Sequence, residues 1–439
     1  FIYLKNDLKS AIIMIMQKNV FKAMGPGILI ACAAIGGSHL VWATKAGAEF
    51  GWQLLGLVLI ANFLKFPFFY FGQHYTAVTG ESMLSGYKRL GTPYLYIFLI
   101  INALTGTINI AAVGMLTASL CAPYLSALTL TLPHISILLF ILILLILFLG
   151  HYALLDKLSK WIISVLGICT LYAVFLAFNN QPEIDPSFTP TNPYTLVSLG
   201  FLISLLGWMP APIDLSTWSS LWMHSREKQT GHKPTSKEVA LDFSVGYIAT
   251  TVLACLFLAL GALTVYGTNN PIARSGIEFS NQLIELYTLS IGEYARPLIA
   301  LAAFFTMFST TLTCLDGYPR SLSATLSLLK APLKDKSPCC LTASASVLFS
   351  TYEALLILYA VSASIVLLFF VSNLLQLLTF AAIIAFLTAP ILAWINLRVV
   401  CMPHIPKSKQ PALWIKITSY LGLSFFIVVS IAYVYTKLF

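Results

Sequence analysis

Long apolar segments recur along the whole chain, and they restrict its fold more than any other feature of the sequence. A helix needs about 20 apolar residues to cross the roughly 30 Å hydrocarbon core of a bilayer. Charged residues make up only 9% of the 439 residues, and hydrophobic residues make up 58%. A soluble domain has about 25% charged residues, so a water-facing globule could not bury this apolar surface. The chain is predicted to be a polytopic membrane protein, and the composition excludes nucleic-acid-binding, coiled-coil, collagen-like and disordered classes.

Eleven segments are predicted to span the membrane. They cover residues 23–48, 50–76, 93–120, 133–150, 159–179, 194–222, 240–266, 294–325, 341–371, 373–398 and 412–436. Because the backbone must satisfy its own hydrogen bonds in lipid, these spans are predicted to be helices. Apolar and polar residues do not alternate with a period of two, which argues against a β-barrel. The predicted fold class is therefore an all-α integral membrane protein.

Basic residues indicate how the spans are oriented. If the N-terminal segment 1–22 lies in the cytoplasm, 20 of the 25 lysines and arginines fall on the cytoplasmic side. This distribution follows the positive-inside rule, so we interpret the net charge of +9 as a sign of membrane orientation. The C-terminus is then expected outside, because the number of spans is odd. Segment 1–22 lacks a signal-peptide cleavage site, and the short loops favour a prokaryotic inner membrane.

Two spans contain residues that interrupt a helix in the middle of the membrane. The first span carries Gly36, Gly37 and Ser38 at this depth, and each glycine costs a helix about 1 kcal/mol relative to alanine. The sixth span carries Pro210 and Pro212, which each remove a backbone donor and clash with the preceding turn. Both spans are therefore predicted to be broken helices.

The broken spans begin two predicted five-span units, residues 23–179 and 194–398, which are followed by the eleventh span at 412–436. Since each unit has an odd number of spans, the second unit is expected to be inverted in the membrane. Breaks at matching positions of inverted units are the best sequence sign of a transport site at the midplane. Freed carbonyls can bind a cation there, and freed N–H groups can bind an anion. The alternative is a kinked packing helix in a structural or receptor protein.

Several short segments match the pattern of a known family. They are Gly25-Pro-Gly27 to Ala46-Gly-Ala48, Val78-Thr-Gly80, Met209-Pro210 and Ser309-Thr-Thr-Leu-Thr313. In these segments the chain resembles the Nramp family of proton-coupled divalent-metal transporters. The resemblance implies a LeuT-type fold of 5+5 inverted repeats with broken helices 1 and 6. It also implies secondary active transport of a metal cation or another small cation by alternating access.

The first break departs from the family pattern. Where the family has D-P-G-N, this chain has Gly36, Gly37, Ser38 and His39, so the metal-ligating carboxylate is missing. The His and Asn that follow the family's Met-Pro pair are also replaced. Only Met209 carries over as a direct candidate ligand, and His39 is the other candidate for metal binding. A site of sulfur, imidazole and carbonyl groups is neutral and favours a softer or weakly hydrated ion.

Seven residues at the two breaks are predicted to bind the substrate. They are Gly36, Gly37, Ser38, His39, Trp208, Met209 and Asp214. His39 can bind substrate or carry a proton, or it can be a hydrogen-bonded packing residue. The Gly-Gly-Ser break also looks like that of amino-acid transporters sharing this fold. Ion-coupled transport of an amino acid or other small organic solute therefore stays open, as does a non-transporting membrane sensor.

Seven further residues are candidates for coupling or gating. They are Lys65, Asn109, Asp242, Thr310, Thr311, Asp316 and Arg320. A lysine within a span is by default functional or paired, and snorkelling to the interface is the alternative for Lys65. The acidic residues and Arg320 can instead form a structural ion-pair network. The threonines can serve a sodium ion or ordinary helix contacts.

The sequence contains no sign of an enzyme. A nucleotide-binding glycine-rich loop, a hydrolytic triad and zinc-ligand spacing are all absent, and the loops are too short for an enzymatic domain. We therefore expect transport without a cofactor, driven by a gradient of H⁺ or Na⁺. The expected partners are the lipid bilayer and a small solute or cation, without nucleic acid, and the sequence makes no prediction of oligomeric state.

Overall fold

The fold is helical throughout the part of the chain that the structure describes. The computed structural model describes residues 23–128, 130–268, 276–330, 351–369 and 373–438. Every regular element in these ranges is a helix, and eight helical stretches are long and apolar enough to cross a membrane. The predicted all-α membrane fold is confirmed. The N-terminal segment 1–22 and residues 341–350, 370 and 371 of the predicted ninth span lie outside the described residues.

The first half of the chain begins with a broken helix and continues with long helices. In order, the elements are α3 (Pro26–Ala34), a π-helical turn (Ser38–Ala43), α4 (Thr44–Phe50), α5 (Leu55–Thr79), α6 (Met83–Leu90), α7 (Thr92–Cys121) and α8 (Leu132–Asn179). The predicted spans 50–76 and 93–120 correspond to α5 and α7. The predicted first span is divided between α3 and α4.

Helix α8 differs from the sequence prediction. The two predicted spans 133–150 and 159–179 both lie within this one helix of 48 residues. The polar segment between them contains strong helix formers, such as Ala153 and Leu154, and no proline. Charged residues lower hydropathy without stopping a helix, so a loop inferred from hydropathy can be helical. The number of separate spans therefore stays a prediction.

The second half of the chain repeats the sequence of a short broken helix followed by longer ones. Its elements are α9 (Leu199–Trp208), α10 (Leu215–Thr230), α11 (Ser236–Thr264), α12 (Gly276–Ile291), α13 (Arg296–Lys330), α14 (Thr351–Phe369), α15 (Leu374–Val400) and α16 (Leu413–Leu438). The sequence analysis missed α6 and α12, which lie in predicted loops. On α12, Phe279, Leu283 and Tyr287 are buried at a spacing of four residues, which is the pattern of an amphipathic helix rather than of a span.

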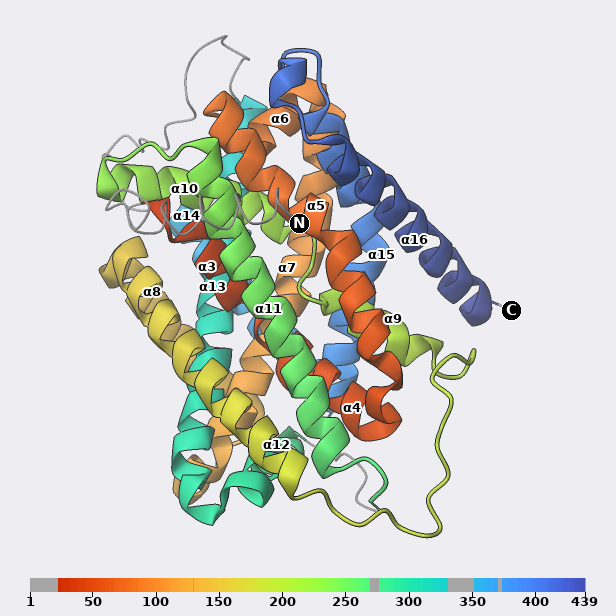
Figure 1. Cartoon of the computed structure of the whole chain (residues 1–439). Helices are drawn as coiled ribbons and strands as arrows, with labels where there is room; N and C mark the ends of the chain where they lie inside the picture. Colours follow the sequence, from red (N-terminus) through yellow and green to blue (C-terminus); the bar gives the residue numbers. More distant parts are fainter. Residues whose placement is uncertain (1–22, 129, 269–275, 331–350, 370–372, 439) are drawn as a thin grey trace.

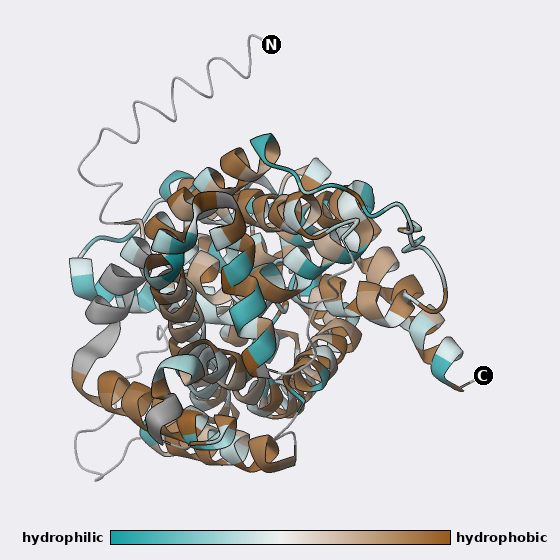
Figure 2. Cartoon of the chain, turned by 90° about the horizontal axis from the view of Figure 1, so that it is seen from below, coloured by the Kyte–Doolittle hydropathy of each residue, from teal (hydrophilic) through white to brown (hydrophobic). Residues whose placement is uncertain are grey.

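The helices bring distant parts of the sequence together. Helix α13 packs along α7, and α11 packs against α3, α4 and α5. Figure 1 shows α16 at one edge of the bundle, where it contacts α5 and α15. Hydrophobic residues cover the outside of the bundle in Figure 2, as a surface that faces lipid tails requires. Most residues of both helix breaks are buried inside this bundle, and Pro212 is half-buried.

Close backbone contact explains the glycines that flank the first break. A Cβ atom added at Gly27 would collide with the backbone of Asp242, and one added at Gly246 would collide with the backbone of Gly27. Gly47 and Gly261 meet the backbone of the facing helix in the same way. Small residues let helices approach closely in a membrane. These two glycine pairs therefore hold α3 and α4 against α11.

Candidate functional site

The first break lies between the end of α3 at Ala34 and the π-helical turn that begins at Ser38. Thr310 of α13 faces it: the Thr310 hydroxyl lies 3.0 Å from the carbonyl oxygen of Cys32 and 3.1 Å from that of Ile35. These carbonyls are among those that lose helical partners at a break. A Cβ atom at Gly36 would meet the Thr310 side chain at 2.8 Å. Glycine is therefore needed at residue 36 for α13 to reach the break.

The second break lies between the end of α9 at Trp208 and the start of α10 at Leu215. Pro210 has no N–H group, so the carbonyl of Leu206 loses its helical donor. Lys65 of α5 replaces it: its ammonium nitrogen lies 2.7 Å from the Leu206 oxygen, 2.9 Å from the Gly207 oxygen and 3.1 Å from the Ala211 oxygen. Lys65 is fully buried. It therefore binds the second break through a charge and does not snorkel to an interface.

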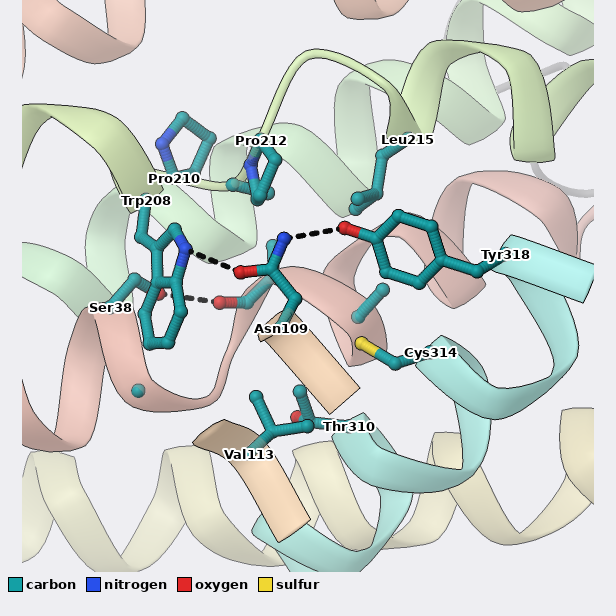
Figure 3. Close-up of a pocket in the computed structure, with 14 residues that line it drawn as sticks. Ser38, Asn109, Val113, Trp208, Pro210, Pro212, Leu215, Thr310, Cys314 and Tyr318 are labelled. Atoms are coloured by element: carbon teal, nitrogen blue, oxygen red, sulfur yellow. Dashed lines mark hydrogen bonds between the residues drawn. The ribbon is translucent and has the colours of Figure 1, made fainter. Parts of the chain in front are cut away.

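A pocket lies between the two breaks, as the sequence predicted. It is a cavity of about 30 Å³ between α3, α7, α9, α10 and α13. Figure 3 shows its lining, which consists of Ala33, Ala34, Gly37, Ser38, Asn109, Val113, Trp208, Pro210, Ala211, Pro212, Leu215, Thr310, Cys314 and Tyr318. Both breaks contribute residues to it. No charged side chain belongs to this lining, so any bound solute meets neutral oxygen, nitrogen and sulfur groups.

Asn109 connects the two sides of the pocket. Its side-chain oxygen accepts a hydrogen bond from Trp208 Nε1 at 3.2 Å, and its Nδ2 donates to the Tyr318 hydroxyl at 2.6 Å (Figure 3). These contacts join α7, α9 and α13 across the pocket. A solute that displaced Asn109 would disturb both sides together.

Asp214 is the carboxylate nearest in sequence to the pocket lining, but it lies behind that lining. It is 2% exposed, and its Oδ2 accepts a hydrogen bond from the Thr105 hydroxyl at 3.3 Å. Its Oδ1 has no hydrogen-bond partner among the described residues. A buried carboxylate oxygen usually has a partner. This oxygen is therefore available to a proton, a water molecule or a cation that enters the site.

The structure does not place the two candidate metal ligands in the pocket. The ring of His39 faces α11: its Nδ1 lies 2.6 Å from the Ser38 hydroxyl, and its Nε2 lies 2.9 Å from the carbonyl oxygen of Thr250. Both ring nitrogens are thus occupied inside the protein, as the packing interpretation of His39 expected. Met209 is fully buried and also does not line the pocket. Among the described residues, no three His, Cys, Asp or Glu side chains form a cluster that could hold a metal ion.

Two of the remaining gating candidates connect helices outside the pocket. Asp242 accepts hydrogen bonds from the backbone N–H groups of Gly25 at 3.1 Å and Gly27 at 2.6 Å, so it fixes the start of α3. Thr311 lies 2.8 Å from Thr117, hydroxyl to hydroxyl, and links α13 to α7.

Asp316 and Arg320 form the predicted i,i+4 ion pair on α13. Asp316 also accepts hydrogen bonds from Trp222 Nε1 at 2.8 Å and from the Tyr352 hydroxyl at 2.6 Å. The pair therefore joins α10, α13 and α14 in one buried network. Such contacts agree with the structural ion-pair interpretation, and neither residue lines the pocket.

Sequence reasoning missed two polar residues of the pocket, Cys314 and Tyr318. They follow Thr310 on α13 at intervals of four residues, and residues at this spacing share one face of a helix. Helical periodicity counted from Thr310 would have found both. This spacing is visible in the sequence, but Cys314 and Tyr318 carry no charge and were therefore not selected.

A second charged cluster lies outside the spans, between α5 and α6. Arg89 donates two hydrogen bonds to Glu81, at 2.8 and 2.6 Å. These bonds hold the pKa of the Glu81 carboxyl below its usual value. The Tyr75 hydroxyl also donates to Glu81 at 3.3 Å. The cluster fixes the turn that joins a long helix to a short one.

Comparisons with known proteins agree with the fold. The family described as "Natural resistance-associated macrophage protein-like" (Nramp) matches residues 27–436. An uncharacterized protein of Pasteurella multocida is 38% identical over 417 residues, which cover 94% of this chain and 92% of that protein. The divalent metal cation transporter MntH of Latilactobacillus sakei is 22% identical over 316 residues, 71% of this chain and 67% of that protein.

A solved structure shows the same fold. The crystal structure of the manganese transporter of Eremococcus coleocola superposes with a TM-score of 0.71 at 15% identity, covering 95% of this chain and 86% of that one. The predicted family and the LeuT-type fold are thereby confirmed. The chain belongs to the Nramp family and is an integral membrane transporter rather than an enzyme.

Proposed function

We propose that this protein moves a metal cation or another small cation across the membrane by alternating access. Its membership of the Nramp family supports this proposal, as do relatives named divalent metal cation transporters. The observation that carries the proposal is the pocket between the two helix breaks, which receives residues from both of them. Breaks of this kind free backbone groups that can bind an ion.

The chemistry of the pocket limits which cation it would bind. Ser38, Asn109 and Thr310 offer neutral oxygens, and Cys314 offers a sulfur. A hard dication needs negatively charged oxygen ligands to offset its lost hydration, and the lining contains none. Sulfur ligands favour softer ions. The proposed cargo is therefore a soft or weakly hydrated cation, with Asp214 close behind the lining as the carboxylate that can offset its charge.

The coupling ion and the orientation also belong to this proposal. The family resemblance favours H⁺, and Na⁺ is the alternative. The two five-helix units, residues 23–179 and 194–398, would alternate around the pocket as inverted repeats. The distribution of basic residues supports a cytoplasmic N-terminus, an external C-terminus and a prokaryotic inner membrane.

Purified protein in liposomes that contain a metal-sensitive dye would test the cargo. We expect a flux of Cd²⁺ that exceeds that of Mn²⁺ and Mg²⁺, because sulfur prefers the softer ion. Cys314→Ala should lower the Cd²⁺ flux. Cys255→Ala is the matched control, since Cys255 lies on α11 outside the pocket. Absence of flux for all three metals, together with no heat of metal binding in calorimetry, would reject metal transport.

A small organic solute such as an amino acid is the second candidate. The uncharged lining favours it. The cavity of about 30 Å³ would have to widen to hold an amino acid, because pockets for small molecules start at about 300 Å³. A panel of amino acids should then contain one that raises the melting temperature. Ser38→Ala should weaken that shift, since Ser38 lines the pocket. If no amino acid stabilises the protein, this candidate is rejected.

A further inference from the structure

The Lys65 ammonium lies where a free cation would be expected at a broken helix. Each of its three N–H bonds has one carbonyl acceptor, in Leu206, Gly207 and Ala211, at 2.7, 2.9 and 3.1 Å. An ammonium group has three donors and no acceptor, so its hydrogen bonding is complete. Among the residues whose side chains the structure describes, no other lysine is buried. The three carbonyl oxygens therefore use all the N–H donors of the ammonium.

Two of the three carbonyls lack helical donors for identifiable reasons. Leu206 would accept from residue 210, which is a proline without an N–H group. The N–H of Leu215, which could bond Ala211 in a continuous helix, instead donates to Pro212 at 3.3 Å. Leu206 and Gly207 belong to the last turn of α9, the negative end of the helix dipole. Without Lys65, this buried cluster of oxygens would repel itself and lack partners.

The charged residues on the two sides of the second break have opposite signs. Lys65 lies at the C-terminal end of α9, and Asp214 immediately precedes α10. Asp214 attracts Lys65 electrostatically. Each charge also has the favourable sign for its helix end. A charge within a span is normally paired, and here the carbonyls and Asp214 share that role.

We propose that Lys65 is a built-in cation for the second break, holding its carbonyls in the place of a free monovalent ion. Lys65 does not line the pocket, but Ala211 does, so this side chain positions one wall of the site from behind. The second break then stays unwound without any ion from solution. A small ammonium ion should be able to replace the side chain when it is removed. The inference concerns the break itself and holds for any cargo.

Thermal unfolding of purified variants in different salts would test the proposal. Lys65→Ala removes the charge and leaves space, whereas Lys65→Met removes the charge and fills the space. In choline chloride we expect both variants to melt about 3–5 °C below the unmodified protein. In methylammonium chloride, Lys65→Ala should recover at least half of this loss, and Lys65→Met should recover none. The unmodified protein should melt at the same temperature in both salts.

Lys45→Ala is the matched control, because Lys45 pairs with Glu49 on its own helix at 3.1 Å. It should show no difference between the two salts. The proposal is wrong if Lys65→Ala fails to fold even in methylammonium, or if it gains no more than Lys45→Ala. A measurement on the unmodified protein is independent of both variants. A density map obtained in choline chloride should show the second break unwound with Lys65 on its carbonyls, and a continuous helix there would overturn the proposal.

Discussion

The two helix breaks of this protein are held in different ways. At the first, the contacts are neutral: the Thr310 hydroxyl lies within 3.1 Å of two freed carbonyls and can donate to either. Beside the break, His39 lies between Ser38 and a carbonyl of α11. At the second, a full positive charge on Lys65 binds three carbonyls. A neutral hydrogen bond contributes about 1 kcal/mol, whereas loss of one partner of a buried charge costs several times more. The comparison indicates that the first break can rearrange more easily than the second, which the Lys65 ammonium holds in place.

The largest expected effect comes from removing the charge at the second break. Lys65→Met should lower the free energy of unfolding by about 3–5 kcal/mol, because three buried carbonyls lose their donor and Asp214 loses a nearby opposite charge. His39→Leu should cost only about 1–3 kcal/mol, since it leaves neutral groups unpaired. Denaturant unfolding in detergent micelles measures both. Equal losses would contradict the difference between the breaks.

The glycines at the two breaks offer a second comparison. A Cβ atom at Gly207 would collide with the backbone carbonyl of Ala382, whereas one at Gly36 would meet only the Thr310 side chain. Gly36→Ala should lower the free energy of unfolding by about 1–3 kcal/mol. Gly207→Ala should lower it more, because the Ala382 backbone cannot move away as a side chain can. Adding Thr310→Ala should relieve the Gly36 variant. If the double variant unfolds as readily as Gly36→Ala alone, the close approach of α13 is not the reason for this glycine.

A smaller effect is expected at the neutral contact of the first break. Thr310→Val keeps the shape of the side chain and removes the hydroxyl that faces Cys32 and Ile35. The expected loss of stability is about 1 kcal/mol. Thr325→Val, on the same helix, is the control, because its hydroxyl bonds only the carbonyl of Ser321. Solute flux should fall in Thr310→Val and stay unchanged in the control, and identical fluxes would remove Thr310 from the site.

The smallest effect is expected from a charge pair outside the spans. Glu81 accepts two hydrogen bonds from Arg89, which hold the pKa of its carboxyl below the usual value. A depressed carboxyl pKa stabilises the folded state above the unfolded pKa of about 4.3, and this stability is lost as pH falls through the folded value. Both side chains are partly exposed, so the contribution is below about 1 kcal/mol.

Unfolding of Glu81→Gln as a function of pH checks this prediction. The variant should lose a little stability at neutral pH, and the difference from the unmodified protein should vanish in acid. If Glu81→Gln lowered the free energy of unfolding as much as Lys65→Met does, burial would not explain why the Lys65 charge matters more.

The spans and the breaks could be predicted because each depends on neighbouring residues alone. Hydropathy marks a stretch that must lie in lipid, and Pro210 or Gly36 weakens a helix wherever it packs. Hydropathy did not predict helix α8 correctly, because the polar segment that ends the predicted span does not end the helix. Trp208 and Ser38 were chosen for their positions at the breaks, and Asn109 was a coupling or gating candidate in the third predicted span. The structure places all three in the pocket lining.

The sequence by itself determined that this chain lies in a membrane, that its helices are broken twice, and that neutral residues occupy the first break. Tertiary structure decided which way each side chain faces. His39 turns toward Thr250 and away from the pocket, and Lys65 reaches oxygens 141 to 146 residues away. The physical reason is that an orphaned buried group takes the nearest partner in space. Which helix supplies that partner follows from packing between distant segments, and no local pattern records it.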